Sequence, residues 1–202
     1  RVATLFVDLG IYHRMCGIVG ILGRAPVAEQ LVDSLKRLEY RGYDSAGIAV
    51  LQNGQIEVRR EAGKLSMLGD LLRQSPIEGN FGIGHTRWAT HGAPSARNAH
   101  PHLGQTGRVV VVQNGIVENF LELREELSAE GVEFKSDTDT ETIVHLVEHY
   151  LASGLDLVEA ARKTFQHIRG ANVVVLISAD EPDKIVTARI GKGDFADLER
   201  AR

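Results

Sequence analysis

Apolar residues recur at two spacings along the chain, and the shorter spacing predicts strands. Consecutive or alternating apolar residues predict strands at residues 17–22, 46–51, 56–59, 81–85, 109–112, 173–177 and 185–190. Asn53-Gly54 separates the second and third of these and is typical of a two-residue hairpin turn. Glu181-Pro182-Asp183 predicts a hairpin between the last two strands.

The longer spacing, of three or four residues, predicts helices. They are expected at residues 31–38, 65–72, 120–127, 143–151 and 158–168. Pro26 suits the first turn of the first helix. Thr138 and Glu141 have the spacing of a capping box before the fourth, and Gly170 follows the fifth. Residues 86–107 are expected to form a polar loop.

The order of these elements predicts an α+β fold. Strands come in hairpins with helices between them, which favours antiparallel sheets covered by helices over a parallel sheet built from βαβ units. No repeat, low-complexity stretch or linker divides the 202 residues, a length that fits one domain.

Composition narrows the class of protein. A hydrophobic content of 43% and a charged content of 25% are typical of a soluble folded protein. The net charge of −4 gives no reason to expect nucleic acid or a membrane surface as a partner. A single cysteine excludes an internal disulfide and favours a reducing cytoplasm.

The first residues form a mostly apolar stretch that is a poor signal peptide. Asp8 interrupts it, and no small-residue cleavage site follows. We expect residues 1–15 to be an upstream extension that is not native, with an ordinary ordered N-terminal strand as the alternative. The domain proper is expected at residues 16–191, followed by a polar tail at 192–202.

Cys16 follows Met15 directly. If Met15 is the first residue made and is then removed, Cys16 carries both a thiol and a free α-amine. An N-terminal amine can take the proton of its own side-chain nucleophile, and both groups titrate near neutral pH. Taken alone, a single cysteine is more often a small buried apolar residue.

Five polar segments occur where packing does not require polar residues. They are MCGIVG at 15–20, RLEYRGYDSAGI at 37–48, GHTRWATHG at 84–92 followed by NAHPH at 98–102, QNGIVEN at 113–119, and SDTDTE at 136–141. Together and in this order they resemble the glutaminase domain of the glucosamine-6-phosphate synthases (glutamine–fructose-6-phosphate aminotransferases, isomerizing). These are N-terminal-nucleophile, class II glutamine amidotransferases. The amidophosphoribosyltransferase branch more often has Gln in place of Tyr43 and Tyr-Ser in place of Trp88-Ala89, but it remains the alternative.

The resemblance implies a fold and a reaction. The fold is an αββα sandwich of antiparallel sheets, here truncated at the C-terminus because the match ends near Gly191. The reaction is hydrolysis of the glutamine side-chain amide to glutamate and ammonia, with Cys16 as nucleophile. Asn114 and Gly115 would form the oxyanion hole, although Asn-Gly alone is most often a turn.

The resemblance also assigns substrate-binding residues. Arg87 would bind the glutamine carboxylate and Asp139 the ammonium, with Trp88, Thr90 and His91 lining the pocket. Without the resemblance, Arg87 would be read as a surface ion pair and Asp139 as a helix N-terminal charge. Arg41 would help to position the nucleophile end, with a structural salt bridge as the alternative. Neither a cofactor nor a metal is implied.

His145 and His149 carry a competing pattern, H-x-x-E-H, found in some zinc proteases. At about 100° per residue both are expected opposite the apolar face of their helix, in solvent, which argues against zinc.

Two features of the sequence argue against activity of the chain as it stands. Residues 1–15 acylate the nitrogen of Cys16, so no free base is present. The resemblance ends near Gly191, and a core strand that is missing beyond this point would leave an open sheet edge. An inactive glutamine-binding fragment is therefore a further alternative. In a complete enzyme, sugar-isomerase domains would use the ammonia to aminate fructose 6-phosphate, and a homodimer is possible.

Overall fold

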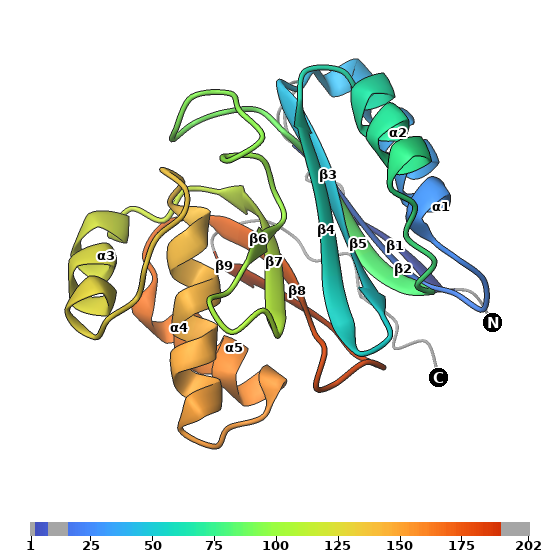
Figure 1. Ribbon diagram of the computed structural model, residues 1–202. Coiled ribbons are helices and arrows are strands. Elements are labelled where there is room, and N and C mark those ends of the chain that lie inside the picture. Colours follow the sequence, from blue (N-terminus) through green and yellow to red (C-terminus); the bar gives the residue numbers. More distant parts are fainter. Residues whose placement is uncertain (1–2, 8–15, 191–202) are drawn as a thin grey trace.

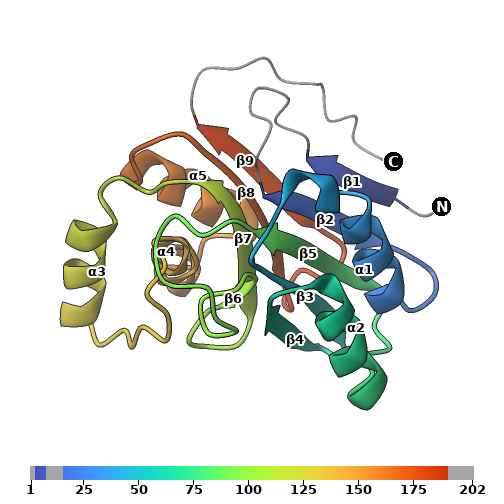
Figure 2. The ribbon, with the colours of Figure 1, turned by 90° about the horizontal axis from the view of Figure 1, so that it is seen from above.

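The computed structural model describes residues 3–7 and 16–190, and it shows two antiparallel sheets stacked face to face. Helices cover the outer face of each sheet, which gives the layer order helix, sheet, sheet, helix (Figure 1). Seen from above, the layers lie side by side with the two sheets in the middle (Figure 2). The predicted αββα sandwich of antiparallel sheets is confirmed.

The first sheet has the strand order β1-β2-β5-β3-β4. Its strands are β1 (Ala3–Val7), β2 (Gly17–Leu22), β5 (Phe81–Arg87), β3 (Ser45–Gln52) and β4 (Gln55–Ala62). β3 and β4 form the predicted hairpin, and its turn residues Asn53 and Gly54 both have positive φ, at 52° and 76°. The helices α1 (Ala28–Lys36) and α2 (Leu65–Gln74) cover its outer face, and the 3₁₀ helix η1 (Glu39–Arg41) follows α1.

The second sheet has the strand order β6-β7-β8-β9. Its strands are β6 (His102–Leu103), β7 (Val109–Gly115), β8 (Asn172–Ser178) and β9 (Ile185–Ile190). The helices α3 (Phe120–Ala129), α4 (Thr140–Ala152) and α5 (Leu157–His167) lie on its outer side.

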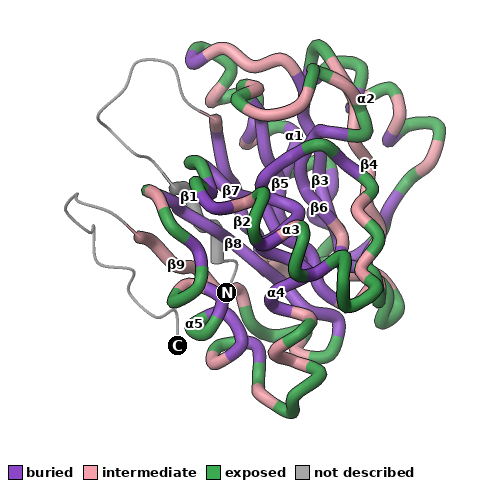
Figure 3. Tube along the Cα trace, turned by 90° about the vertical axis from the view of Figure 1, so that its left-hand side faces the viewer, coloured by how far each residue is buried: buried purple, intermediate pink, exposed green. Residues whose placement is uncertain are grey.

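Alternation along the strands divides the apolar residues among the layers. In β7, Val109 and Val111 pack against α3, α4 and α5, whereas Val110 and Val112 face the first sheet. In β2, Ile18 packs between the sheets and Val19 packs under α1 and α2. The central strands are consequently buried on both faces (Figure 3).

The structure corrects two expectations about local structure. The loop at 86–107 contains a short strand, β6, which pairs with β7. The capping box does not form, because Asp139 is the N-cap of α4 and makes no side-chain cap. Glu141 instead accepts hydrogen bonds from the backbone N–H groups of Lys135 and Ser136, each at 2.7 Å.

The N-terminal segment is partly described. Residues 3–7 form β1, which pairs antiparallel with β2, and the prediction that residues 1–15 are a non-native extension stays a prediction. The predicted tail at 192–202 and residues 8–15 lie outside the described residues. In the described ranges, no helix has the length and apolar character that a bilayer span requires.

Candidate active site

The ends of three strands bring the predicted site residues together. Gly17 of β2 lies opposite Thr86 of β5, so Cys16 is beside the end of β5. The backbone N–H of Trp88 donates to Cys16 Sγ at 3.0 Å. From the second sheet, the end of β7 brings Asn114, whose Nδ2 donates to the backbone oxygen of Cys16 at 2.9 Å.

A pocket of about 290 Å³ opens at this junction. Its lining contains every predicted site residue except His91 and Arg41, together with four others that were not predicted. The lining residues are Cys16, Arg87, Trp88, Thr90, His100, Gln113, Asn114, Gly115, Ile116, Asp139 and Thr140. A larger cavity of about 470 Å³ lies between α1 and α2, away from Cys16, and its lining contains no cysteine or histidine.

The surroundings of Cys16 keep its thiol protonated until a base acts. Burial raises the pKa of the Cys16 thiol, and the Trp88 N–H and the charge of Arg87 oppose this only in part. A thiol in this setting needs a proton acceptor in order to attack. The α-amine of Cys16 would supply one only when no residue precedes it.

Asn114 and Gly115 both line the pocket, and their role as an oxyanion hole stays a prediction. The Asn114 carboxamide nitrogen already lies against the nucleophile residue. Gly115 has φ of 136°, and a Cβ at this position would lie 2.1 Å from the Ala171 oxygen. Only glycine fits there, so the backbone at the end of β7 can turn toward the pocket.

Arg87 is buried and has one hydrogen-bonding nitrogen to spare. Its Nη2 donates to the backbone oxygens of His91 and Gly92, the latter at 3.1 Å. Its Nη1 is buried without a hydrogen-bond partner. A buried guanidinium N–H of this kind suits a carboxylate ligand.

Asp139 is also buried, with a side chain 4% exposed. Its Oδ2 accepts from the backbone N–H of Val117 at 2.7 Å, and its Oδ1 lies 3.9 Å from His91 Nδ1. Burial raises the pKa of Asp139, and the Val117 hydrogen bond works against that rise. A cationic ligand would stabilise the carboxylate in the same way.

His91 and Arg41 lie outside the pocket lining. His91 Nδ1 lies 3.9 Å from Asp139 without a hydrogen bond to it, and the His91 ring packs against Phe120 with ring centroids 5.0 Å apart. Arg41 is buried in η1, and its guanidinium lies 5.5 Å from the centroid of the Tyr40 ring. Its role in positioning the nucleophile stays a prediction.

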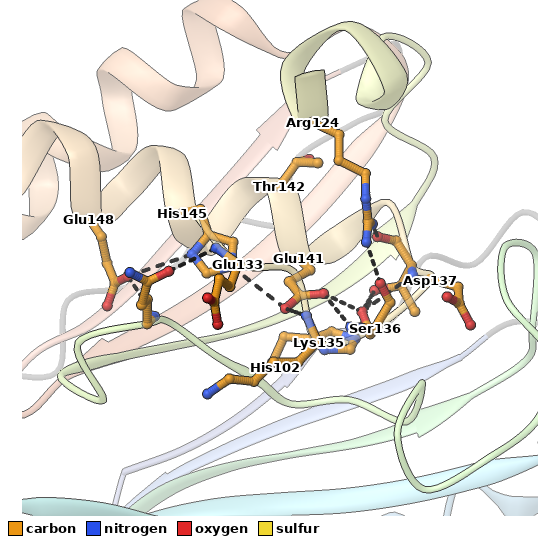
Figure 4. Close-up of polar contacts among 12 residues, drawn as sticks. His102, Arg124, Glu133, Lys135, Ser136, Asp137, Glu141, Thr142, His145 and Glu148 are labelled. Carbon is orange, nitrogen blue, oxygen red and sulfur yellow. Dashed lines mark hydrogen bonds and ion pairs between the residues drawn. The ribbon is translucent and has the colours of Figure 1, made fainter. Parts of the chain in front are cut away.

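The histidines of the zinc-protease pattern differ in environment. The prediction that His145 faces solvent is wrong, because it lies between Glu141, at 3.5 Å, and Glu148, at 3.6 Å, with a side chain 2% exposed (Figure 4). His149 is exposed as expected and pairs with Glu130 at 3.0 Å. Within the described ranges, no group of three or more candidate ligands could hold a metal ion.

Sequence reasoning did not assign the polar network formed by three residues of the pocket lining, His100, Gln113 and Thr140. His100 Nδ1 accepts from the Gln113 N–H at 3.4 Å, and His100 Nε2 lies 3.1 Å from Thr140 Oγ1. Thr140 Oγ1 donates to Gln113 Oε1. The sequence did contain a signal for this network, because His85 and Gln113 are polar residues inside otherwise apolar strands. A polar residue in a strand that is buried on both faces needs a hydrogen-bond partner.

Comparison with known proteins agrees with this geometry. Residues 85–193, more than half of the chain, match the glutamine amidotransferase domain family. A glutamine–fructose-6-phosphate aminotransferase (isomerizing) from Bradyrhizobium diazoefficiens is 57% identical over 177 residues, and one from Agrobacterium fabrum is 54% identical over 177. Each alignment covers 88% of this chain and 29% of the relative, so the chain spans under a third of their length.

Solved structures share the fold. A glutamine phosphoribosylpyrophosphate amidotransferase from B. subtilis, complexed with ADP and GMP, superposes with a TM-score of 0.70 at 21% identity, covering 87% of this chain and 36% of that one. A glutamine aminotransferase class-II domain protein from Silicibacter pomeroyi gives 0.58 at 15% identity, covering 90% and 79%. The cysteine-centred pocket, the fold and the sequence match agree: the chain belongs to the glutamine amidotransferase domain family.

Proposed function

We propose that this domain hydrolyses the side-chain amide of glutamine when Cys16 is its first residue. The observation that carries the proposal is the arrangement around one pocket of the Cys16 thiol, the Asn114 amide, the spare Nη1 of Arg87 and the Asp139 carboxylate. Arg87 would bind the α-carboxylate of glutamine and Asp139 its ammonium, with Thr90 and Trp88 at the sides. His91 would act by holding Asp139.

The reaction would proceed in two steps. The α-amine of Cys16 takes the thiol proton, and Sγ attacks the carboxamide carbon. Asn114 Nδ2–H and the Gly115 N–H hold the oxyanion, each such donor contributing about 3–4 kcal/mol. The protonated amine then gives its proton to the leaving nitrogen, and ammonia departs from a γ-glutamyl thioester.

Hydrolysis of the thioester completes the cycle. The α-amine takes a proton from water, whose oxygen attacks the thioester carbon. The C–S bond breaks, the thiolate regains its proton, and glutamate leaves. One glutamine and one water thus give one glutamate and one ammonia.

The relatives indicate what becomes of the ammonia. Because those enzymes are named for fructose 6-phosphate, we propose that ammonia made here aminates fructose 6-phosphate on sugar-isomerase domains. On this proposal residues 16–191 are the glutaminase domain, residues 1–15 are a non-native extension, and the enzyme is a cytoplasmic homodimer. Amidophosphoribosyltransferase chemistry is less favoured, because the curated relatives match at 57% and that neighbour at 21% identity.

The test is glutamate release by a chain begun at Met15, with Cys16 confirmed as the N-terminal residue by intact mass. We expect turnover that is lost in Cys16→Ala and absent from the chain that keeps residues 1–15. Glutamine binding by calorimetry without turnover, despite the correct N-terminus, would instead support the glutamine-binding fragment. Equal turnover with and without residues 1–15 contradicts a role for the amine.

A further inference from the structure

His85 is a buried titratable residue that the reaction above does not use. It lies in β5 with no exposed surface, and it is not part of the pocket lining. Its Nε2 is 2.9 Å from Asn114 Oδ1, so it touches the residue that would hold the oxyanion. The contact joins the two sheets across their interface.

The neighbours of Asn114 fix which way round its carboxamide lies. The backbone oxygen of Cys16 can only accept a hydrogen bond, so the atom 2.9 Å from it must be the amide nitrogen. The carboxamide oxygen therefore faces His85. That oxygen can only accept, so His85 Nε2 carries a proton.

The rest of the His85 ring is consistent with a neutral imidazole. Its Nδ1 is buried without a hydrogen-bond partner, and a proton there would leave an N–H unsatisfied. Burial lowers the pKa of His85 to about 4, and the nearby charge of Arg87 contributes to the shift. The ring is thus an uncharged donor with its proton on Nε2.

His100 holds the His85 ring in place. The two imidazoles stack with centroids 4.3 Å apart and an interplanar angle of 29°. His100 is itself fixed, since its Nδ1 accepts from Gln113 and its Nε2 can then donate to Thr140. The stack restricts rotation of the His85 ring, and a half-turn about its Cβ–Cγ bond would place a carbon, not Nδ1, where Nε2 now meets Asn114.

We propose that His85 is a positioning residue whose Nε2–H keeps the Asn114 carboxamide nitrogen directed at the oxyanion. This proposal rests on the proposed glutaminase function. Without the donor, only the hydrogen bond to the Cys16 backbone oxygen restrains the carboxamide. It can then turn its own oxygen toward the developing negative charge, where it repels instead of stabilising. His85 would therefore affect the rate of the chemical step and not the affinity for glutamine.

The first experiment compares two substitutions in the chain that begins at Cys16. His85→Leu removes the donor and suits the apolar layer between the sheets, and His85→Gln keeps an N–H near the Nε2 position. For His85→Leu we expect kcat to fall by about 100- to 1,000-fold, as for loss of an oxyanion donor. KM should stay within about threefold, and His85→Gln should recover at least about tenfold of the lost rate.

Alkylation of Cys16 by iodoacetamide separates positioning from general damage. That reaction forms no oxyanion, so its rate in His85→Leu should stay within about twofold of the parent. In the Asn114→Ala background, adding His85→Leu should cost less than about threefold, because its partner is already gone. Parallel loss of alkylation, additive losses, or a His85→Gln variant as slow as His85→Leu would each overturn the proposal.

A second measurement on the complete 202-residue chain needs no activity. Long-range ¹H–¹⁵N spectra should show His85 protonated at Nε2 and bare at Nδ1 at pH 7, with the Nε2 signal moving in Asn114→Ala. Nε2 without a proton would overturn the positioning role even if glutamine is hydrolysed. The expected spectrum, together with no glutamine turnover by the chain that begins at Cys16, would sink the proposed function and leave the contact between His85 and Asn114 intact.

Discussion

The Arg87 side chain is held in place by hydrogen bonds at one terminal nitrogen, while its other terminal nitrogen has no hydrogen-bond partner. One terminal nitrogen is fixed by the backbone oxygens of the loop that follows β5, and the other is buried without a hydrogen-bond partner in a residue that lines the pocket. Because the guanidinium is planar, fixing one nitrogen also fixes where the other points. The direction of carboxylate binding is therefore set before any ligand arrives.

Arg87→Lys tests this at the level of one residue. Lysine keeps the charge and loses the fork, so we expect KM for glutamine to rise by about 10- to 100-fold with a smaller change in kcat. Arg97→Lys is the matched control, since Arg97 is exposed and forms a surface ion pair with Asp137. Steady-state glutamate release measures both, and an unchanged KM in Arg87→Lys contradicts carboxylate binding by Arg87.

Helix α4 carries an unusual share of buried polar residues along its first turns. Glu141 accepts from the Ser136 hydroxyl at 2.6 Å as well as from two backbone N–H groups, and it faces His145. Figure 4 shows these contacts converging on the loop that leads into the helix. Farther along, Glu148 accepts from the Gln105 N–H at 2.7 Å. Glu141 thus connects α4 to the loop that precedes it, and Glu148 connects α4 to the loop between β6 and β7.

Glu141→Gln should therefore destabilise the whole fold. The hydrogen bonds and His145 lower the pKa of Glu141 to about 2, so the carboxylate is charged at pH 7 and the amide would present N–H groups to N–H groups. We expect a loss of about 3 kcal/mol in the free energy of unfolding, measured by urea denaturation at pH 7.

The matched control for this change is Glu130→Gln. Glu130 also pairs with a histidine, but both side chains are about half exposed, at 54% and 46%. Its removal should cost less than about 1 kcal/mol. Equal losses in the two variants would show that burial of the Glu141 contacts has no energetic consequence.

At the scale of the whole molecule, three buried histidines, His85, His100 and His102, form a row in which each ring packs against the next. Burial lowers the pKa of His85 to about 4 and that of His102 to about 3, and the pKa of His100 is also well below its usual value. Each binds a proton on unfolding at pH values below about 6.5, because the unfolded chain restores the ordinary pKa. The contribution of these histidines to the free energy of unfolding is therefore fully present above about pH 6.5 and is lost as the pH falls below that value.

We expect the free energy of unfolding to fall between pH 6.5 and 5. Each histidine contributes up to about 1.4 kcal/mol per pH unit, so the uptake should approach about three protons. Urea midpoints across this range measure it, and His102→Gln should remove one proton from the uptake. A flat profile would contradict neutral burial of the three rings.

Local patterns predicted most elements, and tertiary contacts account for the errors. Asn53-Gly54 and the valines of β7 act through neighbours in the sequence, so turn and strand were both predictable. His145 was misplaced because helical periodicity assumes one apolar face, whereas α4 also buries His145 between two carboxylates of the same helix, Glu141 and Glu148. Cys16, Arg87, Asn114 and Asp139 were assigned by motif. His85 lies within the GHTRWATHG segment but received no role, because its contact with Asn114 exists only once the sheets are stacked.

The pairing of β1 with β2 affects the solubility of the form in which Cys16 has a free amine. Every residue of β1 has a partner in β2, from Ala3 opposite Leu22 to Val7 opposite Ile18. A free amine on Cys16 requires that the connection between these strands be cut, and departure of β1 then bares the hydrogen-bonding edge of β2. Preparations with the exposed amine should accordingly self-associate edge to edge as they are concentrated, so the form suited to turnover is also the less soluble one.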